Sequence, residues 1–181
     1  ISTQLGKVPL KQTIYKPVLD ALATFEIKTI GEVENDCKHH KISLAQLVQA
    51  ILVLNSTEWV VPVDDDSSIK NSISKSENFN AYLLNEAVSN QEYEILSSPV
   101  IGGAIQIGRM GLFYIHDLKQ GNKTPRQCAK FIFNPIEEQG QTLKLKDQPL
   151  DKSADALKAL TLDAKRFFNQ QQVLLAALKI I

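Results

Sequence analysis

The side chains of this sequence that are best suited to nucleophilic, acid–base or metal chemistry are two cysteines and three histidines. A nucleophilic site needs a Ser, Cys or Thr beside a base, and the chain has no G-x-S-x-G elbow. Cys37 and Cys128 lie far apart without metal-ligand spacing, which predicts two buried, reduced thiols. His39 and His40 predict a solvated basic turn, and His116, within an apolar run, predicts a core histidine. We therefore expect no catalytic residue and no metal ligand.

A glycine-rich run, Gly102–Gly108, invites comparison with cofactor-binding loops. Its sequence matches neither G-x-G-x-x-G nor G-x-x-x-x-G-K-[ST], and two adjacent glycines are also what a tight turn requires. The chain also lacks an acidic residue followed by a G-x-G turn, the arrangement that class I methyltransferases use for S-adenosylmethionine. The acidic run Asp64–Asp66 lacks the alternating ligands of a calcium loop and predicts a solvated turn. The sequence therefore predicts no cofactor site within this chain.

Composition places the chain among ordinary globular proteins. Its 181 residues are 44% hydrophobic and 22% charged, which excludes disorder and collagen-like repeats. Lysine and arginine balance aspartate and glutamate to a formal net charge of zero, so the broad basic surface typical of nucleic-acid binding is absent. No apolar stretch approaches the ~20 residues needed to span a bilayer, and we expect a cytoplasmic protein without a membrane partner. The first residue is Ile1, from which we interpret the chain as a fragment.

Capping chemistry predicts three helix starts, each with a Ser or Thr followed three positions later by Glu or Gln. The pairs are Thr29 with Glu32, Ser43 with Gln46, and Thr124 with Gln127. The helix after Ser43 has apolar residues at helical spacing along one face. Pro135 should end or kink the helix that starts at Thr124.

The first domain is predicted to span residues 1–63 and to resemble a winged helix. A further helix is expected at Pro17–Phe25, with Pro17 in its first turn. The run Glu58–Val63 is predicted to be a strand. Three helices followed by a strand are the order of a winged-helix domain. Its third helix, Ser43–Ser56, would enter a DNA major groove, but it has no Lys or Arg, so phosphate attraction would fall to Lys38–Lys41.

The remainder is predicted to be a linker or mobile loop at 64–78 and a helical region with short strands at 79–181. The expected elements are helices at Phe79–Val88, Met110–Leu118 and Ser153–Leu178, strands at Tyr93–Ser97 and Val100–Ile107, and a hairpin or wing at Thr142–Leu150. The fold class is therefore α+β and mainly α-helical.

The order of motifs after residue 78 resembles a known family. Phe79-Asn80 heads a helix, Leu96–Ile105 follows, an apolar helix ends at Gly121, and Gln139–Leu143 precedes Lys146–Leu150. This set is similar to the C-terminal region of bacterial methyltransferases that carry a methyltransferase regulatory domain, including rickettsial protein-lysine methyltransferases. With the winged-helix segment, the resemblance covers about Val8 to Ile181. The family's Lys-Asp-Gly turn reads Lys-Asp-Gln at Lys146–Gln148, and the linker is longer and more acidic.

The resemblance implies an accessory role for this chain. In the family, S-adenosylmethionine binds an N-terminal Rossmann-like domain, so no catalytic residue carries over and the chain alone should be inactive. We expect the catalytic domain of the same polypeptide as its partner, a protein substrate, and no nucleic acid. The alternative is a stand-alone winged-helix regulator that binds DNA or protein. Six positions match family motifs and are interpreted as structural or interdomain residues: Phe79, Asn80, Pro99, Gly102, Gly103 and Gly140.

Overall fold

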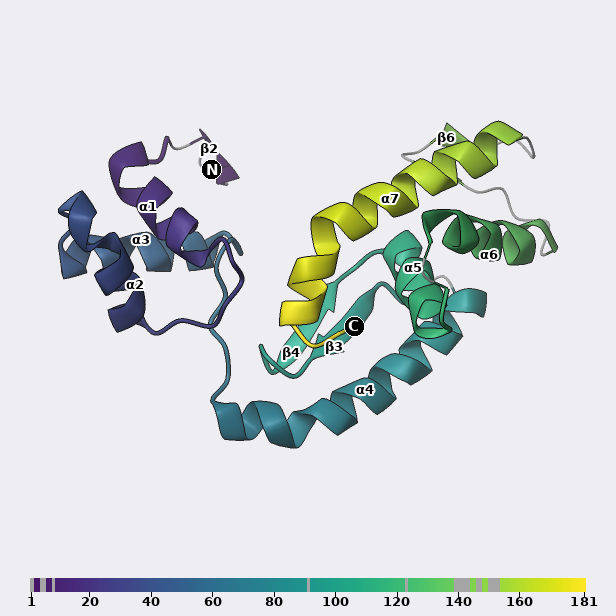
Figure 1. The fold of residues 1–181 in the computed structure, drawn as a ribbon, viewed down its shortest axis with the longest axis horizontal. Helices are drawn as coiled ribbons and strands as arrows, with labels where there is room; N and C mark the ends of the chain where they lie inside the picture. Colours follow the sequence, from purple (N-terminus) through teal and green to yellow (C-terminus); the bar gives the residue numbers. More distant parts are fainter. Residues whose placement is uncertain are drawn as a thin grey trace. The chain divides into compact units, whose positions relative to one another are not determined.

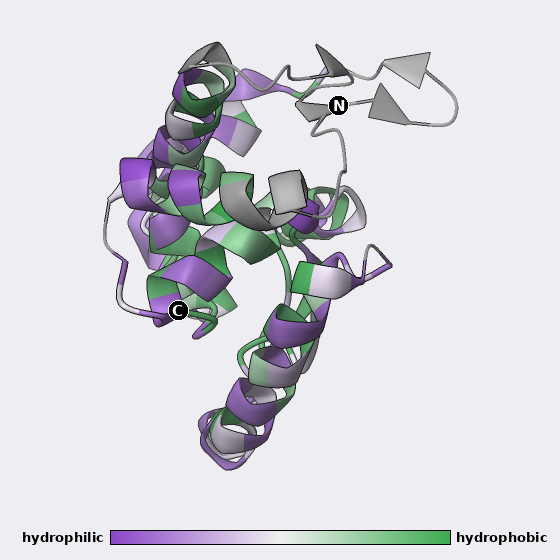
Figure 2. Ribbon diagram, turned by 90° about the vertical axis from the view of Figure 1, so that its right-hand side faces the viewer, coloured by the Kyte–Doolittle hydropathy of each residue, from purple (hydrophilic) through white to green (hydrophobic). Residues whose placement is uncertain are grey.

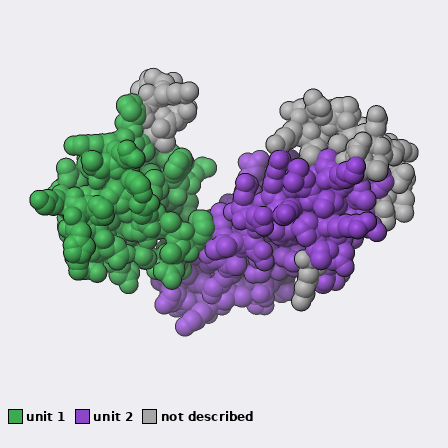
Figure 3. All heavy atoms as spheres, turned by 45° about the horizontal axis from the view of Figure 1, so that its top comes forward, with its two compact units in different colours: residues 1–63 green, residues 64–181 purple. Residues whose placement is uncertain are grey.

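The structure is a computed structural model that describes residues 2–3, 6–7, 9–90, 92–122, 124–138, 144–145, 148–149 and 154–181. It is mainly helical with short antiparallel strand pairs, so the α+β class is confirmed (Figure 1). The chain divides into two compact units, unit 1 at residues 1–63 and unit 2 at residues 64–181 (Figure 3). Of the helices that the structure describes, none combines the length and apolar character needed to cross a membrane.

Unit 1 is a small cluster of three helices. Its elements are β1 (Ser2–Thr3), β2 (Gly6–Lys7), α1 (Gln12–Leu22), α2 (Ile30–Cys37), the 3-10 helix η1 (Lys38–His40) and α3 (Leu44–Ser56). The core is built from one to three apolar residues of each α-helix: Val18, Val33, Cys37, Leu47, Ala50 and Leu54. Unit 1 therefore has a core of few and mostly small side chains.

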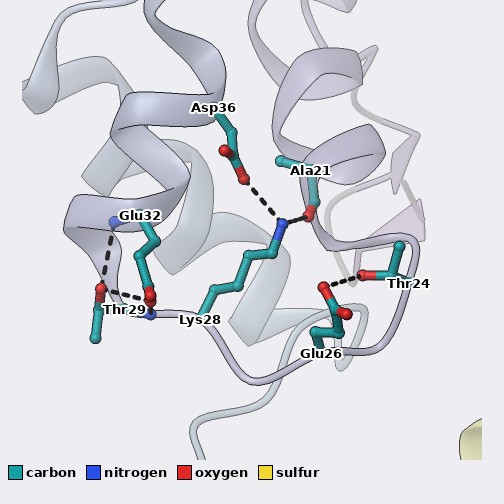
Figure 4. Close-up of polar contacts among 7 residues, drawn as sticks. All are labelled: Ala21, Thr24, Glu26, Lys28, Thr29, Glu32 and Asp36. Atoms are coloured by element: carbon teal, nitrogen blue, oxygen red, sulfur yellow. Dashed lines mark hydrogen bonds and ion pairs between the residues drawn. The ribbon is translucent and has the colours of Figure 1, made fainter.

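The predicted capping boxes start α2 and α3. In α2 the Thr29 hydroxyl accepts from the Glu32 N–H at 3.2 Å, and the Glu32 carboxylate accepts from the Thr29 N–H at 2.7 Å (Figure 4). Beside this cap, Lys28 Nζ donates to the Ala21 carbonyl and to the Asp36 carboxylate, both at 2.8 Å. Lys28 thereby ties the end of α1 to α2.

Helix α1 begins earlier than the sequence predicts. Pro17 lies inside the helix instead of in its first turn, although proline cannot donate the hydrogen bond of that position. Ile14 and Tyr15, which precede Pro17, pack against the core of unit 1. Burial of these two side chains offsets the missing bond, and it explains why the start predicted from proline alone is wrong.

The predicted strand at Glu58–Val63 is also wrong. Residues 57–63 form a turn and an irregular segment, because α3 ends in a cap in which Glu58 takes a left-handed backbone conformation (φ 61°). The Trp59 N–H then donates back to the Leu54 carbonyl at 3.0 Å, as in a Schellman motif. Unit 1 thus has the three helices of the predicted winged helix but, among residues 9–63, no wing strand.

The predicted linker at 64–78 forms most of a long helix. Helix α4 runs from Asp66 to Ser89, and the Asp65 carboxylate caps it by accepting from the N–H groups of Ser67 and Ser68. In Figure 2, α4 is the lowest helix and carries bands of hydrophilic and hydrophobic residues. Its buried or half-buried face includes Ile69, Ile73, Ser76, Asn80, Leu83 and Ala87. That spacing is helical, but two polar members conceal it from a search for apolar residues.

Unit 2 packs helices around a β-hairpin. After α4 come β3 (Ile95–Ser98), β4 (Gly103–Gln106), α5 (Arg109–Lys119), α6 (Pro125–Glu138), β5 (Lys144–Leu145), β6 (Gln148–Pro149) and α7 (Ala154–Ala177). Strands β3 and β4 are antiparallel, from the pair Ile95–Gln106 to the pair Ser98–Gly103. The helix α6 continues through Pro135, so the end expected there is wrong.

Helix α5 is enclosed by unit 2, as its apolar sequence predicts. Five consecutive residues, 111–115, are buried, and the Tyr114 ring lies 5.3 Å from the Phe167 ring of α7. The Tyr114 hydroxyl donates to the Asp163 carboxylate at 2.9 Å, and burial raises the pKa of this phenol. Tyr114 therefore joins α5 to α7 with both an apolar and a polar contact.

Candidate functional site

Four of the six family-motif residues meet around the β3–β4 hairpin, and Asn80 holds it to α4. The Asn80 side chain is 2% exposed. Its Nδ2 donates to the Ser97 carbonyl at 2.8 Å, and its Oδ1 accepts from the Ser97 N–H at 2.7 Å. The amide thus satisfies both outward backbone groups of one residue of β3, as a neighbouring strand would.

Ser98 and Pro99 connect the same hairpin to the end of α7. Both residues are buried. The Ser98 hydroxyl donates to the Leu178 carbonyl at 2.8 Å and accepts from the Val100 N–H at 3.2 Å. One hydroxyl here joins two segments that lie 80 positions apart in the chain.

Gly102 is required by the turn between the strands. Its φ is +59°, a left-handed conformation that favours glycine, and a Cβ at this position would overlap the Asp64 carboxylate. The Asp64 N–H donates to the Val100 carbonyl at 2.9 Å. Asp64 therefore belongs to the hairpin turn, and its acidic neighbour Asp65 caps α4. We call this assembly of Asp64, Asn80, Ser97, Ser98 and Gly102 the hairpin junction.

Gly103 and Phe79 lie outside the hairpin junction. Gly103 is the first residue of β4, and its backbone is exposed. Phe79 is 50% exposed on α4 and takes no part in the hydrogen bonds of the hairpin junction. Gly140 lies outside the described residues.

His116 is half-buried on α5, in a setting suited to packing. Its ring stacks on Phe131 at 5.4 Å, and its Nε2 lies 3.1 Å from Asn85 Oδ1. Its Nδ1 is buried and has no partner among the described residues. Burial lowers the pKa of His116, and nearby Asp117 partly opposes this shift. The neutral imidazole is therefore the favoured form.

Asp117, next in sequence, is fully buried and was not anticipated as a polar core residue. Its Oδ1 accepts from Asn122 Nδ2 at 2.6 Å, and its main-chain carbonyl accepts from the Asn122 N–H at 3.2 Å. Burial, reinforced by the nearby Asp117 carboxyl group, raises the pKa of the Cys128 thiol to about 12. A thiol in this state is a poor nucleophile, so this cluster supports the α5–α6 connection and not a reaction.

The remaining candidates of the sequence are structural. Cys37 and Cys128 are free and buried, as predicted. His39 and His40 are exposed in η1, the turn between α2 and α3. Within the described ranges, no group of three or more His, Cys, Asp or Glu residues could hold a metal ion. The arrangement can position segments of chain, but the described side chains do not form a nucleophile–base pair.

Helix α3 presents an uncharged, partly apolar surface. Leu44 and Leu52 are 49% and 62% exposed, and the whole stretch 42–57 has no charged residue. Trp59, just after α3, is 64% exposed. We refer to Leu44, Leu52 and Trp59 as the apolar surface of unit 1.

The comparisons with known proteins add one relative. No protein-family model matches the chain, and no solved structure does. The chain is 24% identical over 176 residues to a protein of Synechocystis known as Uncharacterized protein sll1526. The match covers 97% of this chain and 34% of the relative, so the chain spans about a third of the length of the curated relative it matches.

Proposed function

We propose that this chain is an accessory, substrate-recognition region of an S-adenosylmethionine-dependent methyltransferase that acts on protein side chains in the cytoplasm. The catalytic domain lies elsewhere in the same polypeptide. This region docks on that domain and helps to form the groove that admits a polypeptide. Methyl transfer therefore requires both parts, and the present chain alone is inactive.

The observation that carries this proposal is the hairpin junction. Asn80, Pro99 and Gly102, which match motif positions of the methyltransferase family, support one β-hairpin through buried hydrogen bonds and a left-handed turn. Such residues position a loop and do not react with substrate. The length of the Synechocystis relative is consistent with further domains in the same polypeptide.

The apolar surface of unit 1 supports docking on another protein domain. Leu52 and Trp59 each expose more than half of their side chain, and burying such side chains contributes about 1.5–3 kcal/mol each. Interface centres are depleted in charge and enriched in aromatic side chains such as Trp. The uncharged stretch 42–57 has this character.

The test uses the natural, complete polypeptide. We expect it to bind S-adenosylmethionine by calorimetry and to transfer a labelled methyl group to protein, whereas the 181-residue chain does neither. Deletion of this region should retain cofactor binding and abolish transfer. If the complete polypeptide does not bind S-adenosylmethionine, the proposal is wrong.

A matched pair of variants tests the docking surface. Leu52→Lys places a charge on the apolar surface, and Val173→Lys makes the same change at a residue of α7 with nearly equal exposure, 63% against 62%. We expect only Leu52→Lys to reduce methyl transfer by the complete polypeptide, about tenfold if one anchor side chain is lost. Equal effects of both variants would argue against docking through α3.

The alternative function is DNA binding by unit 1. Its exposed Lys38, His39, His40 and Lys41 form the basic turn that could contact phosphate. However, α3 has no Lys or Arg, and no wing strand follows it in residues 57–63. A tight complex with duplex DNA that weakens steeply with salt would favour this alternative, because phosphate contacts release counterions.

A further inference from the structure

The two outer edges of the β3–β4 hairpin differ in whether their outward backbone groups have hydrogen-bond partners. On β3 the Asn80 side chain bonds the outward N–H and carbonyl of Ser97. Helix α4 covers this side of the hairpin, and the Ser97 hydroxyl lies 3.3 Å from that of Ser76 in α4. The edge of β3 is therefore closed at Ser97 by side chains of a helix.

The backbone pattern of the hairpin identifies the groups on the other edge. The Ile107 N–H donates to the Glu94 carbonyl at 2.8 Å, which makes residues 94 and 107 a hydrogen-bonded pair. Such pairs alternate in an antiparallel ladder, so the N–H and carbonyl groups of Ala104 and Gln106 point away from β3. By the same alternation, the N–H and carbonyl of Ser97 point outward on β3, where the Asn80 side chain bonds both.

Apart from its length of only four residues, the outer edge of β4 has none of the usual protection. Across the described residues, no group bonds the outward backbone of Ala104 or Gln106, and both residues are exposed. Natural edge strands are commonly blocked by proline, lysine, a bulge or a covering segment. The sequence of β4 is Gly-Ala-Ile-Gln, with no proline and no charge.

We propose that the outer edge of β4 binds an extended polypeptide segment as an added β-strand. The two N–H groups and two carbonyls alternate along this edge, as the groups of an extended partner strand do. A helix could not pair with them, because its own backbone groups are already hydrogen-bonded within the helix. Gly103 leaves room beside this strand, since only the Ile101 carbonyl would lie within 4 Å of a Cβ there, at 3.7 Å. The inference rests on the proposed function only in assigning this segment as the methyl acceptor.

Strand addition explains why the junction has to be rigid. The edge of β4 presents its groups in register only while β3 holds β4 in place, and Asn80, Ser98 and Gly102 hold β3 and the turn. Main-chain bonding supplies affinity with little dependence on sequence. The choice among methyl acceptors then depends on the alternate side chains of the bound segment and on the catalytic domain.

The test measures peptide binding by the full 181-residue chain. The probe is a short, soluble peptide of alternating Thr and Val with one central Lys. Its control is the same peptide with N-methyl groups on every second residue, which removes the donors of one edge. We expect the first peptide to slow amide exchange of Ala104 and Gln106 about tenfold and the N-methylated peptide to have no effect.

A pair of protein variants adds an independent measurement. Ala104→Pro removes an outward N–H without removing a bond of the β3–β4 ladder, and proline is tolerated at such edge positions. Ala104→Ser alters the side chain and retains the N–H. We expect Ala104→Pro to weaken peptide binding about fivefold to tenfold and Ala104→Ser to leave it nearly unchanged. Unchanged exchange of the Leu96 and Ile105 amides reports that the hairpin of Ala104→Pro is intact.

Each other outcome overturns the inference. No binding of the Thr-Val peptide, equal binding of the N-methylated peptide, or protection elsewhere than β4 would show that the edge is not a strand acceptor. Concentration-dependent dimerisation that Ala104→Pro abolishes would instead assign the edge to a second copy of the chain. Peptide binding at β4 without methyl transfer by the complete polypeptide would retain this inference and refute the methyltransferase proposal.

Discussion

Units 1 and 2 differ in which side chains they expose and which they bury. Among the described residues, most of the exposed large hydrophobic side chains lie in the smaller unit 1, including Ile27, Leu52 and Trp59. All of the buried polar or charged side chains lie in unit 2: Ser76, Asn80, Ser98 and Asp117. Unit 1 therefore leaves apolar side chains at its surface, whereas unit 2 buries polar side chains in its interior.

The physical reason lies in size and connection. A unit of about 60 residues buries a smaller fraction of its surface than one of about 120, so apolar side chains remain at its surface. The larger unit has to position a hairpin, four helices and a chain end. Hydrogen bonds fix direction and register in a way that apolar contacts do not, because they have angular requirements.

The largest expected effect comes from the same substitution in each core. Leu54 in unit 1 and Leu112 in unit 2 are both fully buried, and Leu→Ala at such sites lowers the free energy of unfolding by about 2–5 kcal/mol. Trp59, the single tryptophan, reports unit 1 by fluorescence, and amide hydrogen exchange reports unit 2. We expect each variant to destabilise its own unit alone. A joint shift of both signals would mean that the chain unfolds as one cooperative body.

Loss of the Asn80 side chain should come next. Asn80→Ala leaves the Ser97 N–H and carbonyl without their partner, at a cost of about 2 kcal/mol for unit 2. Asn78→Ala, at an exposed position of the same helix, is the control for helix propensity. Urea unfolding followed by circular dichroism measures both. An equal change in the two variants would contradict the role of the hairpin junction.

A cap of unit 1 should contribute less. Ser43→Ala removes the acceptor for the Gln46 N–H at the start of α3 and should lower the free energy of unfolding by about 1 kcal/mol. Ser43→Asp keeps an acceptor and should restore most of the stability. Fluorescence of Trp59 during urea unfolding gives the difference. A Ser43→Asp variant as unstable as Ser43→Ala would indicate that the cap is not the cause.

The smallest effect is expected from the titration of His116. Because burial lowers its pKa in the folded state, the unfolded chain takes up the proton more readily. Stability should therefore be full above the usual histidine pKa of 6.5 and decline as the pH falls below it. His116→Gln should remove this part of the decline, while Asn85 retains a possible partner. Identical pH profiles of thermal unfolding for the two proteins would refute the assignment.

Local signals of the sequence were sufficient where a structure depends on neighbouring residues. The capping pairs at Thr29, Ser43 and Thr124 predicted their helices because each cap is completed within three residues. The burial of α5 followed from its apolar sequence, and the burial of both cysteines from their lack of metal-ligand spacing. Proposals about methyl transfer and its acceptor stay predictions, because they concern parts of a protein beyond this chain.

Long-range contacts explain why the helix at 64–78 and the buried polar residues were missed. The linker predicted at 64–78 is part of α4 because Ser76 and Asn80 find partners on β3, and a polar residue is compatible with a buried helix face only when such partners exist. Pro17 lies within α1 because Ile14 and Tyr15, which precede it, pack against the core of unit 1. Sequence alone thus determined the fold class, the capped helices and the apolar faces. Only the tertiary structure decided which polar side chains are buried and which strand edge stays open, since both depend on partners that are distant in the chain.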